Sequence, residues 1–171
     1  MHYLTDTNLN WQLIADKDSK LKQLSDLSDK IVAMTRFSGT DLLTDMAVKK
    51  AKPKYQVFRV QVNDVLVRLA MLQNHEIDAY WFAEPQITKA LSADNNSLFN
   101  SEDAGVHLGV VAIMDKVRRQ DEEAAFAAAY DKAVEQINKN GVKYYSALIQ
   151  KYMKVDESVV RALPDIKYTK I

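Results

Sequence analysis

The chain has 171 residues, of which 47% are hydrophobic and 27% charged, and 23 basic residues balance 23 acidic ones, so the formal net charge is zero. This balance argues against nucleic-acid binding, which needs a basic surface, and gives no electrostatic reason to bind an anionic membrane. Cysteine is absent, which excludes disulfides, thiolate metal sites and cysteine nucleophiles. No apolar run is long enough to span a bilayer, and the first residues do not resemble a signal peptide.

Strand and helix patterns alternate through the middle of the chain. Runs rich in β-branched and aromatic residues predict strands, and apolar residues at helical spacing predict helices. The predicted strands are KIVAMT (30–35), YQVFRVQV (55–62) and IDAYWF (77–82). The predicted helices are DLLTDMAVKKA (41–51), NDVLVRLAMLQN (63–74) and PQITKAL (85–91). This alternation predicts an α/β fold with three layers and a mostly parallel central sheet.

The flanking segments have different patterns. Before the alternation, WQLIADKDS (11–19) predicts a strand and LKQLSDLSDK (21–30) a short helical stretch. After it, a polar loop at 92–103 leads into GVHLGVVAIM (105–114), which is strongly strand-like. Three amphipathic helices are then predicted, at 121–140, 142–153 and 156–163.

Three predicted turns from strand to helix contain polar residues. They are SGTD (38–41), ND (63–64) and AEP (83–85). Parallel strands end at one edge of their sheet, and ligands bind at that edge in open α/β sheets. We therefore expect Ser38, Asp64 and Glu84 to lie along one edge, at helix N-termini.

Each turn has a structural and a functional interpretation, and both remain open. Ser38, Thr40 and Asp41 are natural helix caps and Gly39 permits a tight turn, but the free N–H groups there could also hold an anionic group. Asn63-Asp64 is better explained as a cap. Glu84 is either an acid favoured by a helix dipole or a ligand for a polar or cationic group.

Other site types find little support. No G-x-G-x-x-G follows a predicted strand, which disfavours a dinucleotide-binding dehydrogenase. No pair of histidines or carboxylates has the spacing of metal ligands, so we expect no catalytic metal.

The order of several segments resembles a known family. LSDLSDKIVAMTRFSGTD, IDAYWFAEPQITKAL, HLGVVAIMDK and AFAAAYDKAVEQIN occur in that order, and the resemblance covers about residues 11–163. They are similar to the extracytoplasmic solute-binding proteins of ABC transporters, in the branch for sulfonates, nitrate, taurine and thiamine pyrimidine. No single motif is specific, and Asp29 stands where the family usually has glycine.

The resemblance implies a type 2 periplasmic-binding fold, in which two lobes joined by two crossover strands enclose the ligand. Family members are longer than this chain, so we expect a fragment. Residues 20–104 would form the second, mobile lobe. Residues 1–19 and 105–171 would supply crossover strands and C-terminal helices of an incomplete first lobe.

By this resemblance, the whole protein captures a small polar solute outside the cytoplasmic membrane and delivers it to an ABC permease. Its location would be periplasmic or extracytoplasmic, with membrane contact only through an anchor absent from this chain. It would be no enzyme and have no catalytic residue, cofactor, metal or nucleic-acid partner. The implied ligand-binding residues are Ser38, Gly39, Thr40, Asp41, Tyr80, Trp81, Glu84 and His107.

Two alternatives share the fold. Thiamine-pyrimidine synthases carry a cysteine-rich motif that is missing here, and the effector-sensing domains of transcription regulators follow a DNA-binding helix-turn-helix. The solute itself stays open. Ser38, Gly39 and Thr40 suit a sulfonate, phosphate or carboxylate, whereas Asp41 and Glu84 suit an amine or a nitrogen heterocycle. A zwitterion such as taurine would satisfy both sets.

A fragment of this kind would also lack a partner for its apolar surfaces. The side chains that would lose their contacts are Val110, Val111, Ile113, Phe126 and Tyr130. Large exposed apolar surfaces are uncommon in stable monomers, so we expect a homodimer.

Overall fold

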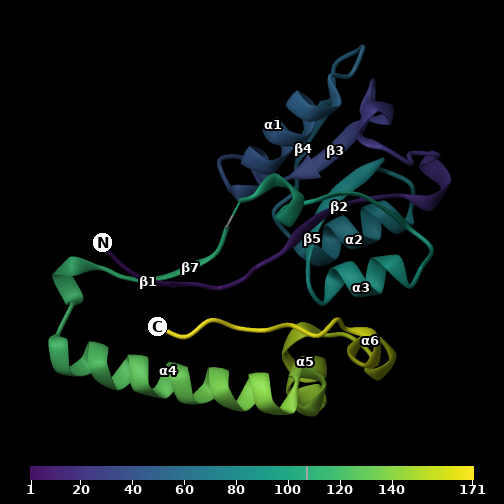
Figure 1. Ribbon diagram of the computed structural model, residues 1–171. Coiled ribbons are helices and arrows are strands. Elements are labelled where there is room, and N and C mark those ends of the chain that lie inside the picture. Colours follow the sequence, from purple (N-terminus) through teal and green to yellow (C-terminus); the bar gives the residue numbers. More distant parts are fainter. Residues whose placement is uncertain (107) are drawn as a thin grey trace. The chain divides into compact units, whose positions relative to one another are not determined.

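The computed structural model describes residues 1–106 and 108–171, and the chain forms two compact units (Figure 1). The central unit is Asn10–Val106, and the terminal unit combines Met1–Leu9 with His107–Ile171. Within the described residues, no helix has both the length and the apolar character needed to cross a membrane. Because the terminal unit contains residues from both ends of the sequence, the chain passes from one unit to the other twice.

A five-stranded sheet with the order β4-β3-β5-β2-β6 forms the centre of the central unit. β3 (Ile31–Met34) pairs in parallel with β4 (Phe58–Gln61) and β5 (Ala79–Ala83). β2 (Trp11–Ala15) runs antiparallel to both β5 and β6 (Asn96–Asn100). Because β2 alone is reversed, the other four strands share one direction, and the prediction of a mostly parallel α/β sheet is confirmed.

Helices pack on the sheet through the alternating side chains of β5. Its Tyr80 and Phe82 belong to an apolar cluster with residues of α2 (Val65–Gln73) and α3 (Gln86–Leu91). Trp81, on the opposite face, donates its indole N–H to the Thr44 hydroxyl of α1 (Gly39–Ala51), over 2.8 Å. Both faces of β5 are thus covered. Three short 3₁₀ helices lie in the connections: η1 (Lys17–Ser19), η2 (Leu24–Leu27) and η3 (Glu102–Ala104).

The terminal unit contains a two-stranded antiparallel sheet and a group of helices. The strands are β1 (His2–Asp6) and β7 (Val110–Ile113). The helices are η4 (Asp115–Val117), the long α4 (Gln120–Asn140), η5 (Val142–Tyr145), α5 (Ser146–Met153) and α6 (Glu157–Ala162). An apolar cluster that includes Val142, Val155 and Val160 joins the C-terminal helices.

The last residues of the chain run alongside α4 (Figure 1). Tyr168 exchanges two hydrogen bonds of 2.9 Å with the Asn138 amide, through its backbone N–H and C=O. The Ile171 N–H donates to the Asp131 carboxylate over 2.8 Å. These bonds tie the extended C-terminal segment to the helix.

Two strands were missed in the sequence. His2–Asp6 forms β1, and Asn96–Asn100, expected to be part of a polar loop, forms the edge strand β6. Only Phe99 of β6 is buried, and most of its other residues are polar, so the sequence lacks the apolar pattern that predicts a strand. The predicted strand at 11–19 is the shorter β2, and it lies in the central unit.

Candidate functional site

The turns after β3, β4 and β5 lie next to one another, because these strands are parallel and adjacent. We call the turns at 35–38, 62–64 and 84–85 the carboxyl edge. Ser38 caps α1 by accepting a hydrogen bond from the Thr40 N–H, and Asp64 caps α2 by accepting from Leu66 and Val67. The predicted placement of Ser38, Asp64 and Glu84 along one edge is confirmed.

The turn before α1 offers free backbone donors. The Ser38 hydroxyl donates to the Thr35 carbonyl over 2.7 Å, and the Thr40 hydroxyl accepts from the Thr35 N–H over 3.1 Å. Among the described residues, the N–H groups of Ser38 and Gly39 have no acceptor. They lie at the positive end of the α1 dipole, where an anionic group is stabilised. Thr40 is only 4% exposed, so its side chain shapes the turn.

Asp41 holds the same turn in place. One carboxylate oxygen accepts from the Phe37 N–H over 2.9 Å. The other lies 3.5 Å from Arg36 Nη1 and 3.4 Å from Arg59 Nη1. A cationic solute would have to compete with two arginines for this carboxylate, so we assign Asp41 a bracing role.

Glu84 has one occupied and one available oxygen. Its Oε2 accepts from both the N–H and the hydroxyl of Thr88, over 3.1 and 2.8 Å. Within the described residues, Oε1 has no hydrogen-bond partner, and the side chain is half-buried. Glu84 therefore accepts a backbone N–H from the first turn of α3 and can still accept a bond from a solute. The peptide bond between Glu84 and Pro85 is cis.

Two of the expected ligand-binding residues lie elsewhere. Tyr80 and Trp81 are both 0% exposed, because helices cover both faces of β5, so they are core residues that do not reach the surface of this unit. The expected ligand residue His107 falls outside the described residues.

Arg68 lies beneath the carboxyl edge and was not identified in the sequence. It is 3% exposed, and its Nη2 donates to the Thr35 hydroxyl over 2.6 Å and to the Asn63 carbonyl over 3.1 Å. Its Nε donates to the Val62 carbonyl. Burial lowers the pKa of Arg68, and the charge of Asp64 opposes that shift. Arg68 therefore joins two turns of the edge with a buried guanidinium, and its only sequence signal is one basic residue on an apolar helix face.

Phe37 is a second residue that the sequence did not single out. It is 94% exposed at the carboxyl edge, and its φ of 57° lies in the left-handed region. The Arg36 guanidinium carbon lies 5.5 Å from the centre of its ring. A bulky side chain in this conformation is unusual, and strained residues of this kind concentrate at functional sites.

The edge continues past Glu84 to the start of β2. Trp11 pairs with Ala83, so the amino end of β2 meets the carboxyl end of β5. There the buried Ser101 hydroxyl accepts from the Trp11 N–H over 2.9 Å and lies 3.1 Å from Asn10 Oδ1. Asn10 and Ser101 therefore add polar groups to this end of the edge.

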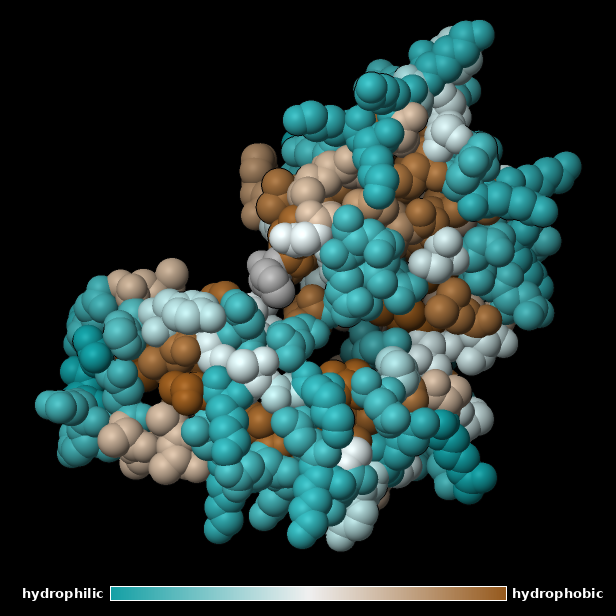
Figure 2. All heavy atoms as spheres, viewed as in Figure 1, coloured by the Kyte–Doolittle hydropathy of each residue, from teal (hydrophilic) through white to brown (hydrophobic). Residues whose placement is uncertain are grey.

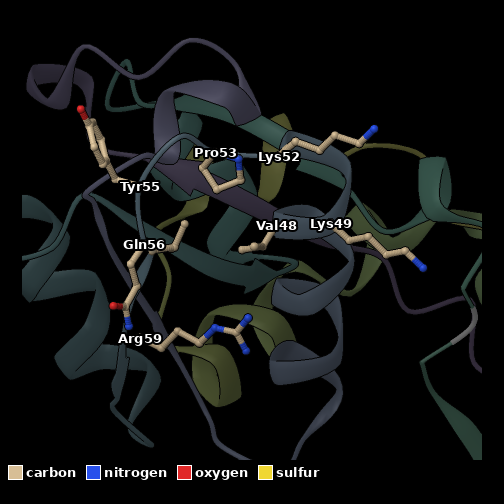
Figure 3. A pocket seen from close by; sticks show the side chains of 8 residues that line it. Val48, Lys49, Lys52, Pro53, Tyr55, Gln56 and Arg59 are labelled. Carbon is tan, nitrogen blue, oxygen red and sulfur yellow. The ribbon is translucent and has the colours of Figure 1, made fainter.

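A surface hollow of about 580 Å³ lies elsewhere on the central unit (Figure 3). It is formed where α1 ends and β4 begins, at the opposite edge of the sheet. The Lys49 and Lys52 side chains point outward from it, and Arg59 is paired with Asp45 at 2.6 Å. Arg59 also contacts Asp41, so its side chain extends from this hollow toward the carboxyl edge.

Comparisons with known proteins find similarity in structure alone. No family model matches the sequence, and no curated protein matches it. The periplasmic aliphatic sulphonate binding protein SsuA from Escherichia coli aligns with a TM-score of 0.71 and 18% identity, over 92% of this chain and 54% of its own. The fold is that of the type 2 periplasmic-binding proteins.

Two further proteins with the type 2 periplasmic-binding fold are similar. A putative periplasmic sulfonate-binding protein from Methylobacillus flagellatus has a TM-score of 0.66 and 24% identity, over 94% of this chain and 50% of its own. The alkanesulfonate-binding protein SsuA from Xanthomonas axonopodis bound to MOPS has a TM-score of 0.57 and 18% identity, over 88% of this chain and 53% of its own. The chain thus spans about half the length of these relatives.

Proposed function

We propose that the chain belongs to an extracytoplasmic solute-binding protein that delivers a small polar molecule to an ABC importer. The central unit is then the second lobe, a three-layer domain, and the terminal unit contributes crossover strands and helices of the first. The proposal rests on the type 2 periplasmic-binding fold together with the polar carboxyl edge. In folds with two lobes, hinge closure encloses the ligand. Binding and release require no bond chemistry, so the proposed protein is not an enzyme.

One observation carries the proposal for the solute. Free N–H donors at Ser38 and Gly39 follow β3, and the free Oε1 of Glu84 follows the adjacent strand β5. The donors suit an anionic head group, and the carboxylate suits an ammonium group. A short zwitterionic sulfonate such as taurine provides both charges. The relatives named as sulfonate-binding proteins agree with this choice.

Thermal-shift measurements on the natural protein test this function. We expect taurine to raise the melting temperature the most, because ligands that bind only the folded state stabilise it. Ethanesulfonate, which lacks the amine, should give a smaller rise, and ethylamine should give none. Nitrate and the thiamine pyrimidine are tested in the same way, because they are the other solutes of the family branch that the sequence resembles.

The Glu84→Gln variant makes the test specific. Glutamine can still accept the Thr88 hydrogen bonds but loses the charge, so taurine binding should weaken by about tenfold, while ethanesulfonate binding stays near its original value. An equal loss for both ligands would remove Glu84 from the ammonium site. No response to any sulfonate would overturn the proposed solute class.

A further inference from the structure

A second group of polar side chains lies at the opposite edge of the central sheet. Asp16 and Asp18 follow the end of β2, and His75 lies in the connection between α2 and β5. The pairing of Ala15 with Ala79 brings these two connections together, although His75 and Asp16 are 59 residues apart in the sequence. This long separation explains why no ligand spacing is visible in the sequence.

The three side chains lie close together, with one carboxylate near each ring nitrogen of His75. Asp16 has a side chain only 4% exposed, and its Oδ1 accepts from the Asp18 N–H over 2.9 Å. Its Oδ2 contacts His75 Nδ1, and His75 Nε2 lies 3.5 Å from Asp18 Oδ2. One ligand atom from each residue lies within 4.8 Å of the other two. For comparison, two ligand atoms on one tetrahedral zinc ion lie about 3.3 Å apart, because each metal–ligand distance is about 2.0–2.1 Å.

The backbone and the charge favour a cation at this point. His75 has a φ of 60°, in the left-handed region, and its N–H donates to the Leu72 carbonyl over 3.1 Å at the end of α2. The turn therefore fixes the position from which the imidazole extends. Two carboxylates face this one ring, so the group keeps excess negative charge whether His75 is neutral or protonated.

We propose that Asp16, Asp18 and His75 bind one divalent transition-metal ion, with zinc as the reference ion. A ring nitrogen of neutral His75 and one oxygen from each carboxylate would be the protein ligands, with water completing the coordination. Any proton on His75 leaves to solvent on binding. An imidazole with two carboxylates suits zinc and its neighbours, whereas calcium and magnesium prefer sites made only of oxygen ligands.

This site is independent of the proposed solute site. The five residues of β5 separate the two edges, which corresponds to about 16 Å at a rise of about 3.3 Å per residue. The bound ion would therefore not contact a solute at the carboxyl edge. It would instead link the connection after β2 to the connection before β5, and so stabilise the central unit.

Calorimetric titration of the untagged chain with zinc chloride at neutral pH tests the proposal. We expect one zinc ion per chain with micromolar affinity, and no measurable binding of calcium chloride. His75→Gln and Asp18→Asn should each weaken zinc binding by about tenfold or more, since each removes one of three protein ligands. His75 and Asp18 are exposed, so neither change should unfold the unit, and unchanged tryptophan fluorescence verifies this.

Two matched variants serve as controls. His2→Gln removes a histidine in the terminal unit, and Glu76→Gln removes a carboxylate next to His75 but outside the group. Both should keep the original affinity within about twofold. Absence of zinc binding, a loss below threefold in His75→Gln or Asp18→Asn, or a loss in His2→Gln as large as theirs would each overturn the proposed site.

Discussion

Arg68 shows how a single buried residue can hold a binding edge together. Its guanidinium bonds to the turns after β3 and β4, and it lies 4.5 Å from the centre of the Tyr80 ring. A lone arginine in VLVRLAML gives no indication of these contacts, because one partner is the Thr35 hydroxyl, 33 residues away, and the others are backbone carbonyls of the preceding turn. The contacts of such a residue can be identified only from the assembled sheet.

Replacing Arg68 by methionine should destabilise the central unit. We expect a loss of about 1–3 kcal/mol, because three hydrogen bonds disappear while removal of a buried charge offsets part of the cost. Both tryptophans lie in the central unit, so urea unfolding followed by tryptophan fluorescence measures this loss. Arg36→Met, at an exposed site on the same edge, should stay within about 0.5 kcal/mol. Equal stability of the two variants would contradict the role of Arg68 in joining the two turns.

Phe37 should contribute to binding rather than to stability. Asparagine tolerates the left-handed conformation, so Phe37→Asn should keep the free energy of unfolding within about 0.5 kcal/mol. The same change removes a 94% exposed ring beside the free donors of Ser38 and Gly39, and affinity for a sulfonate with an apolar tail should fall. Calorimetry with hexanesulfonate measures the effect. A variant that binds as well as the original would show that the ring does not contact the solute.

The burial of Tyr80 and Trp81 was not predicted from the sequence, and it has a simple physical cause. IDAYWF was identified correctly as a strand, but two adjacent aromatics near its end were expected to contact a ligand. In a strand covered on both faces, successive side chains are all buried, and Tyr80 and Trp81 follow that rule. The caps at Ser38 and Asp64 were predictable because they depend on local chemistry alone.

At the scale of elements, the alternating strands and helices were predictable from periodicity, and the marginal strands were not. β3, β4 and β5 and their following helices occur where the sequence predicted them. β6 was missed because it is an edge strand of mostly polar residues, stabilised by pairing with β2, which lies more than 80 residues earlier. The pairing of β1 with β7 joins segments even further apart in sequence.

Gly109 permits the close approach of the two strands of the terminal unit. A Cβ atom there would lie 2.0 Å from Thr7 Oγ1 and 3.2 Å from Leu9 Cβ, while the Thr7 N–H donates to the Gly109 carbonyl over 2.9 Å. We expect Gly109→Ala to destabilise this unit by about 1–3 kcal/mol, as overpacking does. Hydrogen exchange of the β1 and β7 amides measures it.

A second substitution provides the control for Gly109→Ala. Thr7 Oγ1 is buried without a hydrogen-bond partner among the described residues, so Thr7→Ala alone should cost little. In the double variant the worst overlap is gone, and protection of the β1 amides should largely return. If Thr7→Ala gives no rescue, the close contact with Thr7 is not what makes glycine necessary.

At the scale of the whole molecule, the terminal unit has substantial exposed apolar surface. Figure 2 shows hydrophobic residues among the polar ones on its visible face. Val110 is 52% and Phe126 45% exposed, and Tyr144, Leu148 and Tyr152 are more than half exposed at helical spacing. A hollow of about 350 Å³ with a mostly apolar lining borders Leu148. A two-stranded sheet is also marginally stable alone.

We therefore predict that the chain self-associates, most simply as a two-fold dimer. Light scattering coupled to gel filtration at high micromolar concentration should give twice the monomer mass. Leu148→Glu, which places a charge in the exposed apolar stripe, should shift the mass toward the monomer. A monomeric wild-type chain would mean that these side chains need no partner.

The central claim is that the carboxyl edge of the central sheet binds the solute, and amide chemical shifts test it most directly. The ¹⁵N-labelled chain is titrated with taurine, and weak binding is still visible as gradual shift changes. We predict changes at Ser38, Gly39 and Thr88, next to the free donors and the Glu84 carboxylate, with none at His75 on the opposite edge. Absence of changes at millimolar taurine, or changes confined to the terminal unit, would contradict the proposed site.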